Sequence, residues 1–470
     1  KPASASEVKP DMRDLVLTIG MLFYTPLSVI APAAGLAVWE WFSLFSPHRL
    51  VYGFAFGKPL NGIIAAATLA GWLISKERKR FTPDALPWFL LAFFVWSTIN
   101  MAFAPYPEYS WKYWNEAMRS FVPVFLVFVL MTRKTRIHGL VWAIVIALGF
   151  YAVKGGLFTI IHAGASDRVY GPPDTQISDN NMLALAILMQ LPLVFYLTRY
   201  TQEKLLRIGL WFAMVLEMIS VLGSYSRGAF VAGAAMLAMF WWRSKNKILY
   251  AVLGSLVVCA TLSLMPAAFW ERMNTLHHVG KDTSFEGRVQ AWHVAFGYAK
   301  DHFPFGAGYN APALSSIFNY YEPGAVLHVA HSIYFEVLGD QGFMGLAIYL
   351  FVILLSFRNV RIVIRQTRDR PDLAWAHDLA NMIFVGLVAY CVGGAALSMA
   401  YYDGYLLLVA LTSSLREITN PAYSEAANNP LLLRPWQRAW KLPTPNGRAA
   451  AGKLMRGVPT AHNLRPGKSP

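Results

Sequence analysis

Charged residues are few in this sequence of 470 residues. Asp, Glu, Lys and Arg together make up 14% of it, against about 25% in ordinary soluble domains. Hydrophobic residues make up 56%, and apolar runs of about 18 or more residues recur along the chain. This composition argues against a set of soluble domains and predicts an all-α, polytopic membrane protein.

Cysteine is also scarce, because the chain has only Cys259 and Cys391. Both lie inside apolar segments, where cysteine acts as a small buried hydrophobic residue. We therefore expect no disulfide bond.

The apolar runs divide the chain into candidate spans. They fall near residues 15–45, 60–75, 85–103, 118–132, 137–162, 180–198, 206–222, 226–242, 247–265, 332–357, 379–398 and 403–416. Pro26 and Pro32 leave open whether 15–45 is one broken helix or two short helices. Counted as one, it brings the expected number of transmembrane helices to about twelve.

Positive charge is distributed unevenly between these spans. A net charge of +15 would suggest a nucleic-acid partner in a soluble protein. Here the Lys and Arg residues form short clusters, at residues 76–80, 132–136, 199–207, 243–247 and 358–370. Under the twelve-span count all five lie on one side of the membrane, which the positive-inside rule makes cytoplasmic. We therefore expect no nucleic-acid partner and a multi-pass protein of the bacterial inner membrane.

This topology predicts five parts. They are an N-terminal cytoplasmic segment (1–14), nine transmembrane helices (15–265), a large periplasmic loop (266–331), three further helices (332–416) and a basic cytoplasmic tail (417–470). The loop has about 65 residues, and loops of that length tend to be functional or disordered. Its aromatic and apolar residues predict an ordered, partly helical cap. The tail is either a solvated terminus or a segment that rests on anionic membrane lipids.

Three arginines on the expected periplasmic side are candidates for binding a phosphate. Arg227, in "GSYSRGAF", begins a span where positive charge is disfavoured, and its small neighbours leave room for a ligand. A guanidinium there could hold a phosphate in bidentate fashion, although an arginine that only reaches to the interface is the alternative. Arg288, in "SFEGRVQAW", is expected in the first turn of an amphipathic helix. Arg168, in "SDRVYG", has the same two interpretations, since Asp167 could pair with it locally.

His331 lies where the large loop becomes a span. An unperturbed imidazole titrates near pH 6.5, which suits a general base at neutral pH, and the alternative is a polar anchor. Glu336 lies about 500° farther around the helix, so we expect it to pair with a neighbouring helix. Asp340 lies one turn beyond Glu336.

Motifs for metal ions and nucleotides are missing. The sequence has no P-loop, and no Asp-x-Asp falls on the expected periplasmic side. His277 and His278 are adjacent, a poor spacing for metal ligands on a helix. We expect no metal and no cofactor. Arginines and a histidine without a metal suit a substrate that brings its own negative charge, such as a lipid diphosphate.

Four segments, in chain order, resemble the O-antigen ligase and polymerase superfamily of bacterial envelopes. They read "RVYGPPDTQISDNNMLALAIL", "GSYSRGAF", "GRVQAW" and "HSIYFEVLGDQGFMGL". "FSPHRLVYGFAF" is also similar to O-glycosylation ligases associated with exosortase systems. The resemblance covers roughly residues 15–416.

The resemblance implies a membrane glycosyltransferase of the GT-C-like type in lipopolysaccharide biosynthesis. It would move O-antigen glycan from undecaprenyl diphosphate to a lipid A-core hydroxyl, with inversion and without a metal. The family arginines fall on Arg227 and Arg288, which would bind the diphosphate, and the family histidine on His331, which would act as the base. The family Arg and Asn of the first segment fall on Arg168 and Asn181. There "PPDTQIS" and "DNN" depart from the usual Asn-Pro-Asn.

Three other functions remain open at this point. A glycan polymerase or a protein O-oligosaccharyltransferase would use the same chemistry with another acceptor. A lipid-linked glycan transporter would need alternating access, often visible as repeated halves with broken spans at matched positions. The sequence has no such repeat, and its polar residues gather on one side.

Overall fold

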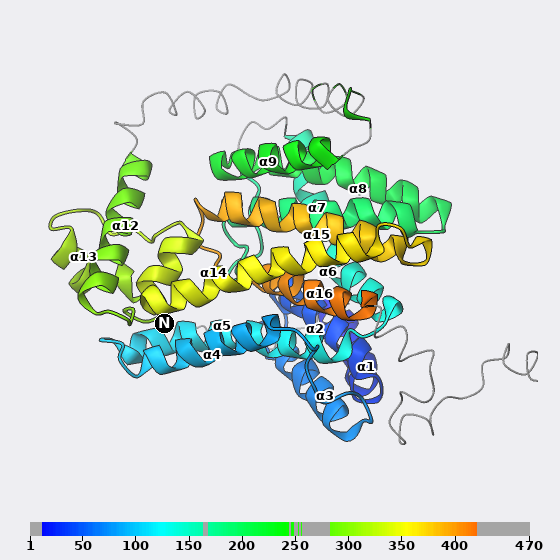
Figure 1. The fold of residues 1–470 in the computed structure, drawn as a ribbon, viewed down its shortest axis with the longest axis horizontal. Coiled ribbons are helices and arrows are strands. Elements are labelled where there is room, and N and C mark those ends of the chain that lie inside the picture. The colour runs from blue at the N-terminus through cyan, green and yellow to red at the C-terminus, as the bar shows by residue number, and fades with distance from the viewer. Residues whose placement is uncertain are drawn as a thin grey trace, which may run out of the picture. The chain divides into compact units, whose positions relative to one another are not determined.

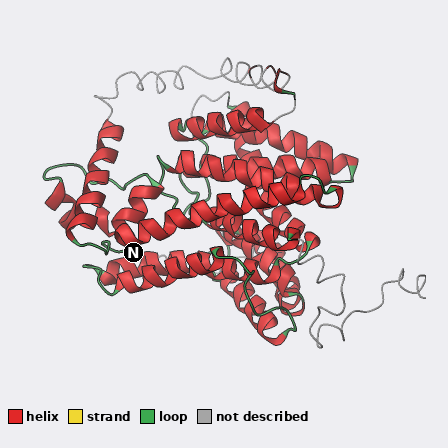
Figure 2. Cartoon of the chain, viewed as in Figure 1, coloured by secondary structure: helices red, strands yellow, loops and turns green. Residues whose placement is uncertain are grey.

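The structure is a computed structural model that describes residues 12–162, 168–243, 246–248, 252, 255 and 283–420. Within these residues the chain forms helices and loops and no strand, so the all-α class is confirmed (Figures 1 and 2). The expected N-terminal segment up to residue 11, most of the expected span 247–265, the first part of the large loop and the tail from residue 421 lie outside the described residues.

The helices follow the apolar runs closely. Before the large loop they are α1 (Met12–Ile30), α2 (Pro32–Phe45), α3 (Leu60–Ile74), α4 (Leu86–Met101), α5 (Pro107–Leu130), α6 (Lys134–Ile161), α7 (Asn180–Tyr200), α8 (Lys204–Gly223) and α9 (Arg227–Arg243). After it come α12 (Thr283–Asp301), α13 (Ser315–Tyr321), α14 (Ile333–Thr367), α15 (Ala374–Gly394) and α16 (Asp403–Thr419). Short 3-10 helices cover Pro47–Arg49, Ala311–Ala313 and Pro371–Leu373.

The apolar stretch 15–45 forms two helices. Proline at residue 32 has no N–H to continue α1, so α2 begins there. The two helices lie against each other, because a Cβ at Gly35 of α2 would stand 2.7 Å from the Ser28 Cα of α1. The chain therefore reverses at Ala31.

This reversal places the start of α1 at an unexpected end of the bundle. The Asp14 carboxylate accepts a hydrogen bond from the Ala55 N–H at 2.9 Å. In the same inter-helix segment, Arg49 pairs with Asp174 of the loop before α7 at 3.1 Å. Residues 12–14 therefore lie at the end that carries the long loops. The prediction that residues 1–14 lie with the basic clusters counted 15–45 as one span, and the side of the membrane on which this segment lies stays a prediction.

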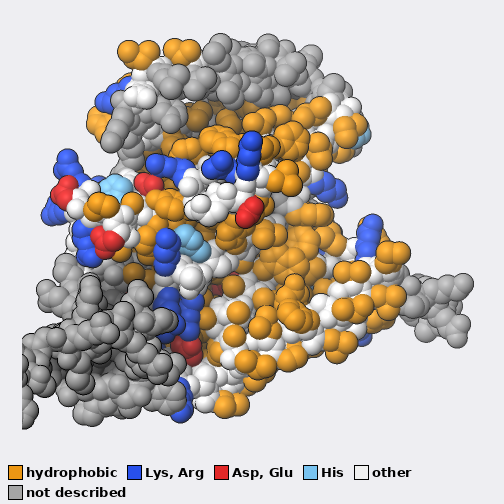
Figure 3. All heavy atoms as spheres, turned by 90° about the vertical axis from the view of Figure 1, so that its right-hand side faces the viewer, with side chains coloured by type: hydrophobic (Ala, Val, Ile, Leu, Met, Phe, Trp, Pro, Cys, Tyr) orange, Lys and Arg blue, Asp and Glu red, His pale blue; other side chains and the backbone are white. Residues whose placement is uncertain are grey.

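Basic clusters gather at the opposite end of the bundle. Arg136 pairs with Glu77 at 2.5 Å, which joins the 132–136 and 76–80 clusters. Arg78 pairs with Glu417 near the end of α16, also at 2.5 Å. The hydrogen bond from Arg136 holds the pKa of the Glu77 carboxyl below its ordinary value. Lys and Arg side chains are visible among hydrophobic ones on this side (Figure 3).

Six described helices are long and apolar enough to cross a membrane. They are α1, α6, α7, α8, α14 and α15 with the turn before it, and α3, α4 and α9 are shorter apolar helices. Many large apolar side chains stay exposed, among them Phe212 at 61% and Leu354 at 60%, as expected for surfaces that face lipid. The chain is therefore a membrane protein by its helices, and the count of twelve stays a prediction.

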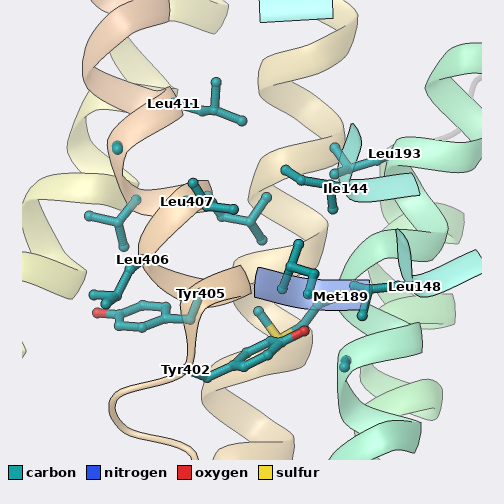
Figure 4. Packing of buried hydrophobic residues seen from close by; sticks show 14 of the residues in the cluster. Ile144, Leu148, Met189, Leu193, Tyr402, Tyr405, Leu406, Leu407 and Leu411 are labelled. Atoms are coloured by element: carbon teal, nitrogen blue, oxygen red, sulfur yellow. The ribbon is translucent and has the colours of Figure 1, made fainter. Parts of the chain in front are cut away.

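The interior is a layer of apolar side chains from several helices. Figure 4 shows leucines of α16 pointing toward Ile144 and Leu148 of α6 and Met189 of α7. Leu407 and Leu411 are completely buried. This core holds α16 between the other helices and fixes the loop that precedes it.

Helix α14 is bent at Gly342, where φ is 69° and ψ is −173°. Side chains avoid this conformation, and a Cβ at Gly342 would also collide with the Pro304 carbonyl oxygen. The expected span therefore begins with a separate short helix, residues 333–341. That short helix and α12 lie at the loop end of the bundle (Figure 1).

Candidate functional site

The site is built where α7, α9 and α14 all begin. Asn180, the first residue of α7, is buried and donates a hydrogen bond to the Ser224 carbonyl oxygen at 2.7 Å. That oxygen belongs to the turn that joins α8 to α9. The contact ties the start of α7 to the turn that presents Arg227, the first residue of α9.

Asn181 and Arg168 lie beside this contact. Asp179 caps α7 by accepting hydrogen bonds from the backbone N–H and the side-chain amide of Asn181, both at 2.8 Å. The side-chain amide of Asn181 is therefore engaged in the helix cap, although we expected it to bind substrate. Arg168 precedes Val169, whose N–H donates to the Gly223 carbonyl oxygen at 3.3 Å, so Arg168 lies next to the same turn.

Helix α12 covers the segment that leads into α14. The indole of Trp292 donates to the Ala330 carbonyl oxygen at 2.7 Å and stacks on Phe335 at 4.9 Å. Gly287 lies so close to His328 that a Cβ at this position would collide with the imidazole ring. These contacts hold the beginning of α12 against residues 328–331. The expected helix is present, but it begins at Thr283, which places Arg288 in the second turn.

His331 has an unusual backbone and a sheltered ring. Its φ is 43°, a left-handed conformation that is uncommon for residues other than glycine and recurs at functional sites. The Nδ1 atom is buried and has no hydrogen-bond partner among the described residues. Burial lowers the pKa of His331 below its ordinary value, the charge of Arg288 lowers it further, and the charge of Asp179 opposes them. The ring is therefore neutral at pH 7 and can accept a proton.

The three expected catalytic residues come to the same end of the bundle. Arg288 and His331 are near enough for their charges to interact. Gly228, next to Arg227, lies beside Ala396, which follows α15. A Cβ atom at Gly228 would lie 3.5 Å from the Ala396 Cβ. The end of α15 also touches the start of α14, because a Cβ at Gly394 would lie 2.8 Å from Ile333. Helices α9 and α14 therefore both begin against the end of α15.

Two carboxylates of α14 line a cavity of about 390 Å³ beside His331. Glu336 and Asp340 are four residues apart and so share one helix face. Glu336 accepts a hydrogen bond from the Ala400 N–H at 2.9 Å. Asp340 accepts from the Asn310 N–H at 2.9 Å and from the Tyr401 hydroxyl at 3.2 Å. We expected Glu336 to pair with a neighbouring helix, but it binds the connection between α15 and α16 instead.

The cavity brings together segments that sequence reasoning did not connect. Its described lining comes from α5, α7, α12 and α14, from the loops before α7 and between α12 and α14, and from the connection between α15 and α16: Tyr113, Glu116, Ala117, Thr175, Gln176, Ser178, Met182, Ala291, Ala295, Tyr309, Asn310, Pro312, Ala313, His328, Val329, Ala330, Phe335, Glu336, Asp340, Ser398, Met399, Tyr401 and Tyr402. The four-residue spacing of Glu336 and Asp340 was the one signal of it in the sequence. The partners from distant segments had none.

Comparisons with known proteins give two family matches along the chain. Residues 12–202 match a family of unknown function (DUF5935). Residues 212–350 match a family described as O-antigen ligase. No curated protein matches the chain. The second match confirms the resemblance to the O-antigen ligase superfamily over the segment that carries Arg227, Arg288 and His331.

Proposed function

We propose that the protein is an O-antigen ligase, which transfers a glycan from undecaprenyl diphosphate to a lipid A-core hydroxyl. The observation that carries the proposal is the position of His331. Its neutral imidazole lies beside Arg288 and next to a cavity lined by hydroxyl and amide side chains. A base, a cation and a cavity with a few polar groups are the parts that glycosyl transfer from a diphosphate requires.

In this mechanism His331 takes the proton from the acceptor hydroxyl. The hydroxyl oxygen forms a bond to the anomeric carbon of the glycan as the bond from that carbon to the diphosphate oxygen breaks. The diphosphate leaves with the electron pair. Because the attack is in line, the anomeric centre is inverted. A positioned general base typically contributes about 10²–10⁴-fold to such a reaction.

Arg227 and Arg288 bind the diphosphate and stabilise the charge that grows on it. The beginnings of α9 and α14 lie at the same end of the bundle, and a helix N-terminus carries partial positive charge that favours an anion. Arg168 lies next to the turn before α9 and adds a further cation to this end. The proposed chemistry needs no metal ion.

The proposed site faces the periplasm of the inner membrane. The basic clusters at the other end of the bundle support this orientation, since clusters of Lys and Arg mark cytoplasmic loops. The lipid-linked donor then reaches the site from the membrane, where apolar helix surfaces surround it.

The experiment is deletion of the gene followed by a gel of envelope polysaccharide. A ligase predicts that long glycan chains remain on the lipid carrier and that lipid A-core stays unmodified. Single glycan units on lipid A-core would instead indicate a polymerase. Unchanged lipopolysaccharide with loss of protein glycosylation would indicate an oligosaccharyltransferase.

A further inference from the structure

We propose that the cavity beside His331 is the acceptor subsite and that it selects a hydroxyl-rich unit without negative charge. The inference rests on the proposed function, because it assigns the acceptor half of that reaction. It adds the chemical class of the unit that presents the attacking hydroxyl: an uncharged or amino-bearing sugar, and not a phosphorylated or carboxylated one.

The charge of the cavity lining carries the first step. Glu116, Glu336 and Asp340 line the cavity, and the described lining includes no Lys and no Arg. His328 is the one basic side chain in that lining. A phosphate or carboxylate on the acceptor would lose its hydration on entry and would find no Lys or Arg in this lining to pair with, and burying an unpaired charge is costly. The same lining attracts an ammonium group and accepts a neutral sugar.

Hydrogen bonding identifies hydroxyl groups as the complement of this lining. Both oxygens of Asp340 have donors within the protein, Asn310 and Tyr401, so Asp340 holds the wall in place. Glu336 is different, because one of its oxygens accepts from Ala400 and the other has no donor among the described residues. A carboxylate oxygen open to a cavity is a strong acceptor for a sugar hydroxyl.

Aromatic side chains provide the apolar part of the surface. Tyr401 lies against Tyr309 with 4.8 Å between ring centres, and both line the cavity. Phe335 is held from behind by its stack on Trp292. The C–H faces of a pyranose ring pack well on aromatic rings, whereas its hydroxyl edge needs the carboxylate and amide groups. Ligand sites commonly combine such apolar walls with a few placed polar groups.

Size and position agree with a sugar unit beside the base. A volume of about 390 Å³ is enough for one or two sugar rings and lies at the small end of ligand sites. Val329 and Ala330, which directly precede His331, form part of the wall. A sugar bound in the cavity therefore lies beside the segment that leads directly into His331. Arg288 interacts electrostatically with His331 but is not among the residues that line the cavity.

The test measures saccharide binding without any donor. The full chain in nanodiscs at pH 7 is examined by saturation-transfer NMR with three probes: methyl glucoside, methyl glucosaminide and glucose 6-phosphate. Methyl glucoside and methyl glucosaminide should give transfer signals, and glucose 6-phosphate should give a signal at least fivefold weaker. Equal signals from the phosphorylated and neutral sugars would overturn the proposal, as would the absence of any signal.

Two variants assign the binding to this cavity. Glu336→Gln keeps an oxygen for the Ala400 N–H but removes the carboxyl group that pairs with an ammonium group, so the signal of methyl glucosaminide should fall more than that of methyl glucoside. Glu116→Lys, at an exposed part of the lining, should raise the signal of glucose 6-phosphate. Glu203→Gln removes a similar charge from the exposed turn before α8 and should leave all three signals unchanged. If the cavity variants behave like Glu203→Gln, the sugars bind elsewhere and the inference fails.

Failure of this inference and failure of the proposed function give different results. A protein that binds neutral sugars with the expected variant pattern but never transfers glycan retains the cavity as a saccharide site and loses the ligase function. A protein that transfers glycan equally to phosphorylated and neutral acceptors remains a ligase, and the charge selection is wrong.

Discussion

The side-chain amide of Asn180 donates a hydrogen bond to the Ser224 carbonyl oxygen over 2.7 Å, and the two residues are 44 positions apart. Both are buried, so the contact is shielded from water. It is the direct polar link between the start of α7 and the turn that precedes α9. The position of Arg227 therefore depends on Asn180, which was not among the predicted site residues.

We predict that Asn180→Asp reduces glycan transfer by displacing Arg227. The substituted side chain has nearly the same size but offers no N–H to Ser224. An unsatisfied buried carbonyl group costs about 1–3 kcal/mol, which the turn can relieve by moving. The measurement is transfer rate against donor concentration, with the melting temperature measured in parallel.

A positioning role predicts a raised KM for the lipid-linked donor together with a lower kcat. Asn115→Asp, on the exposed surface of α5, is the matched control and should behave as the wild type. If Asn180→Asp lowers only the melting temperature and leaves both kinetic constants unchanged, the contact is structural and does not position Arg227.

Arg227 and Arg288 should each be required for glycan transfer, and lysine should replace them only in part. We expect Arg227→Ala and Arg288→Ala each to reduce transfer by about 10²–10³-fold, the loss that follows removal of one stabilising group for transition-state charge. Lysine at either position should restore only part of the activity, because a point charge lacks the bidentate geometry of guanidinium. The assay is run with and without EDTA, and full activity in EDTA is expected. Loss in EDTA that Mg²⁺ restores would show that the reaction depends on a metal.

Membrane orientation gives a third prediction. A single cysteine is placed at Asn319 in α13 or at Gln202 in the connection between α7 and α8, in a chain whose native cysteines have been replaced. Both positions are exposed, and they lie at opposite ends of the bundle. A membrane-impermeant thiol reagent added to intact spheroplasts should modify the cysteine at 319 and spare that at 202. The reverse labelling pattern would place the site in the cytoplasm.

Gly342 gives a prediction about stability. We expect Gly342→Ala to lower the free energy of unfolding by more than about 1–3 kcal/mol, because φ of 69° with ψ of −173° is nearly restricted to glycine and a Cβ collides with the Pro304 carbonyl oxygen. Gly139→Ala in α6, where a Cβ meets nothing within 4 Å, is the control. The midpoint of thermal unfolding in detergent measures both. Equal midpoints would mean that the bend in α14 tolerates a side chain.

Much of the helix arrangement could be predicted from the sequence, because apolar runs end where helices end. The expected span 60–75 is α3, and the expected span 180–198 lies within α7. The bend at Gly342 could not be predicted, since it depends on a contact with residues 304–305, far away in sequence. The reversal at Pro32 was left undecided because proline is compatible with a kink as well as with a break.

The candidate site was predictable only in part. Arg227, Arg288 and His331 have local sequence signals, since each lies in a short motif at the start of a helix or span. The hydrogen bonds of Asp340 to Asn310 and Tyr401 do not, because the partners come from loops with no regular pattern. The cavity therefore appears only when these loops are folded together.

His331 provides the final prediction, which concerns pH. Burial and Arg288 lower the pKa of His331 below its ordinary value of 6.5, so the imidazole remains neutral at pH 7 and slightly below. The acidic limb of the pH–rate profile should therefore lie below pH 6.5. The unfolded chain binds a proton more readily than the folded one, so the stability from this group is complete above pH 6.5 and decreases as the pH falls through the lowered pKa.

His331→Ala should cut transfer by about 10²–10⁴-fold and remove this dependence, whereas donor binding, which relies on Arg227 and Arg288, should persist. Transfer by the purified variant at a rate near that of the wild type would show that the histidine is only an anchor and that another group accepts the proton.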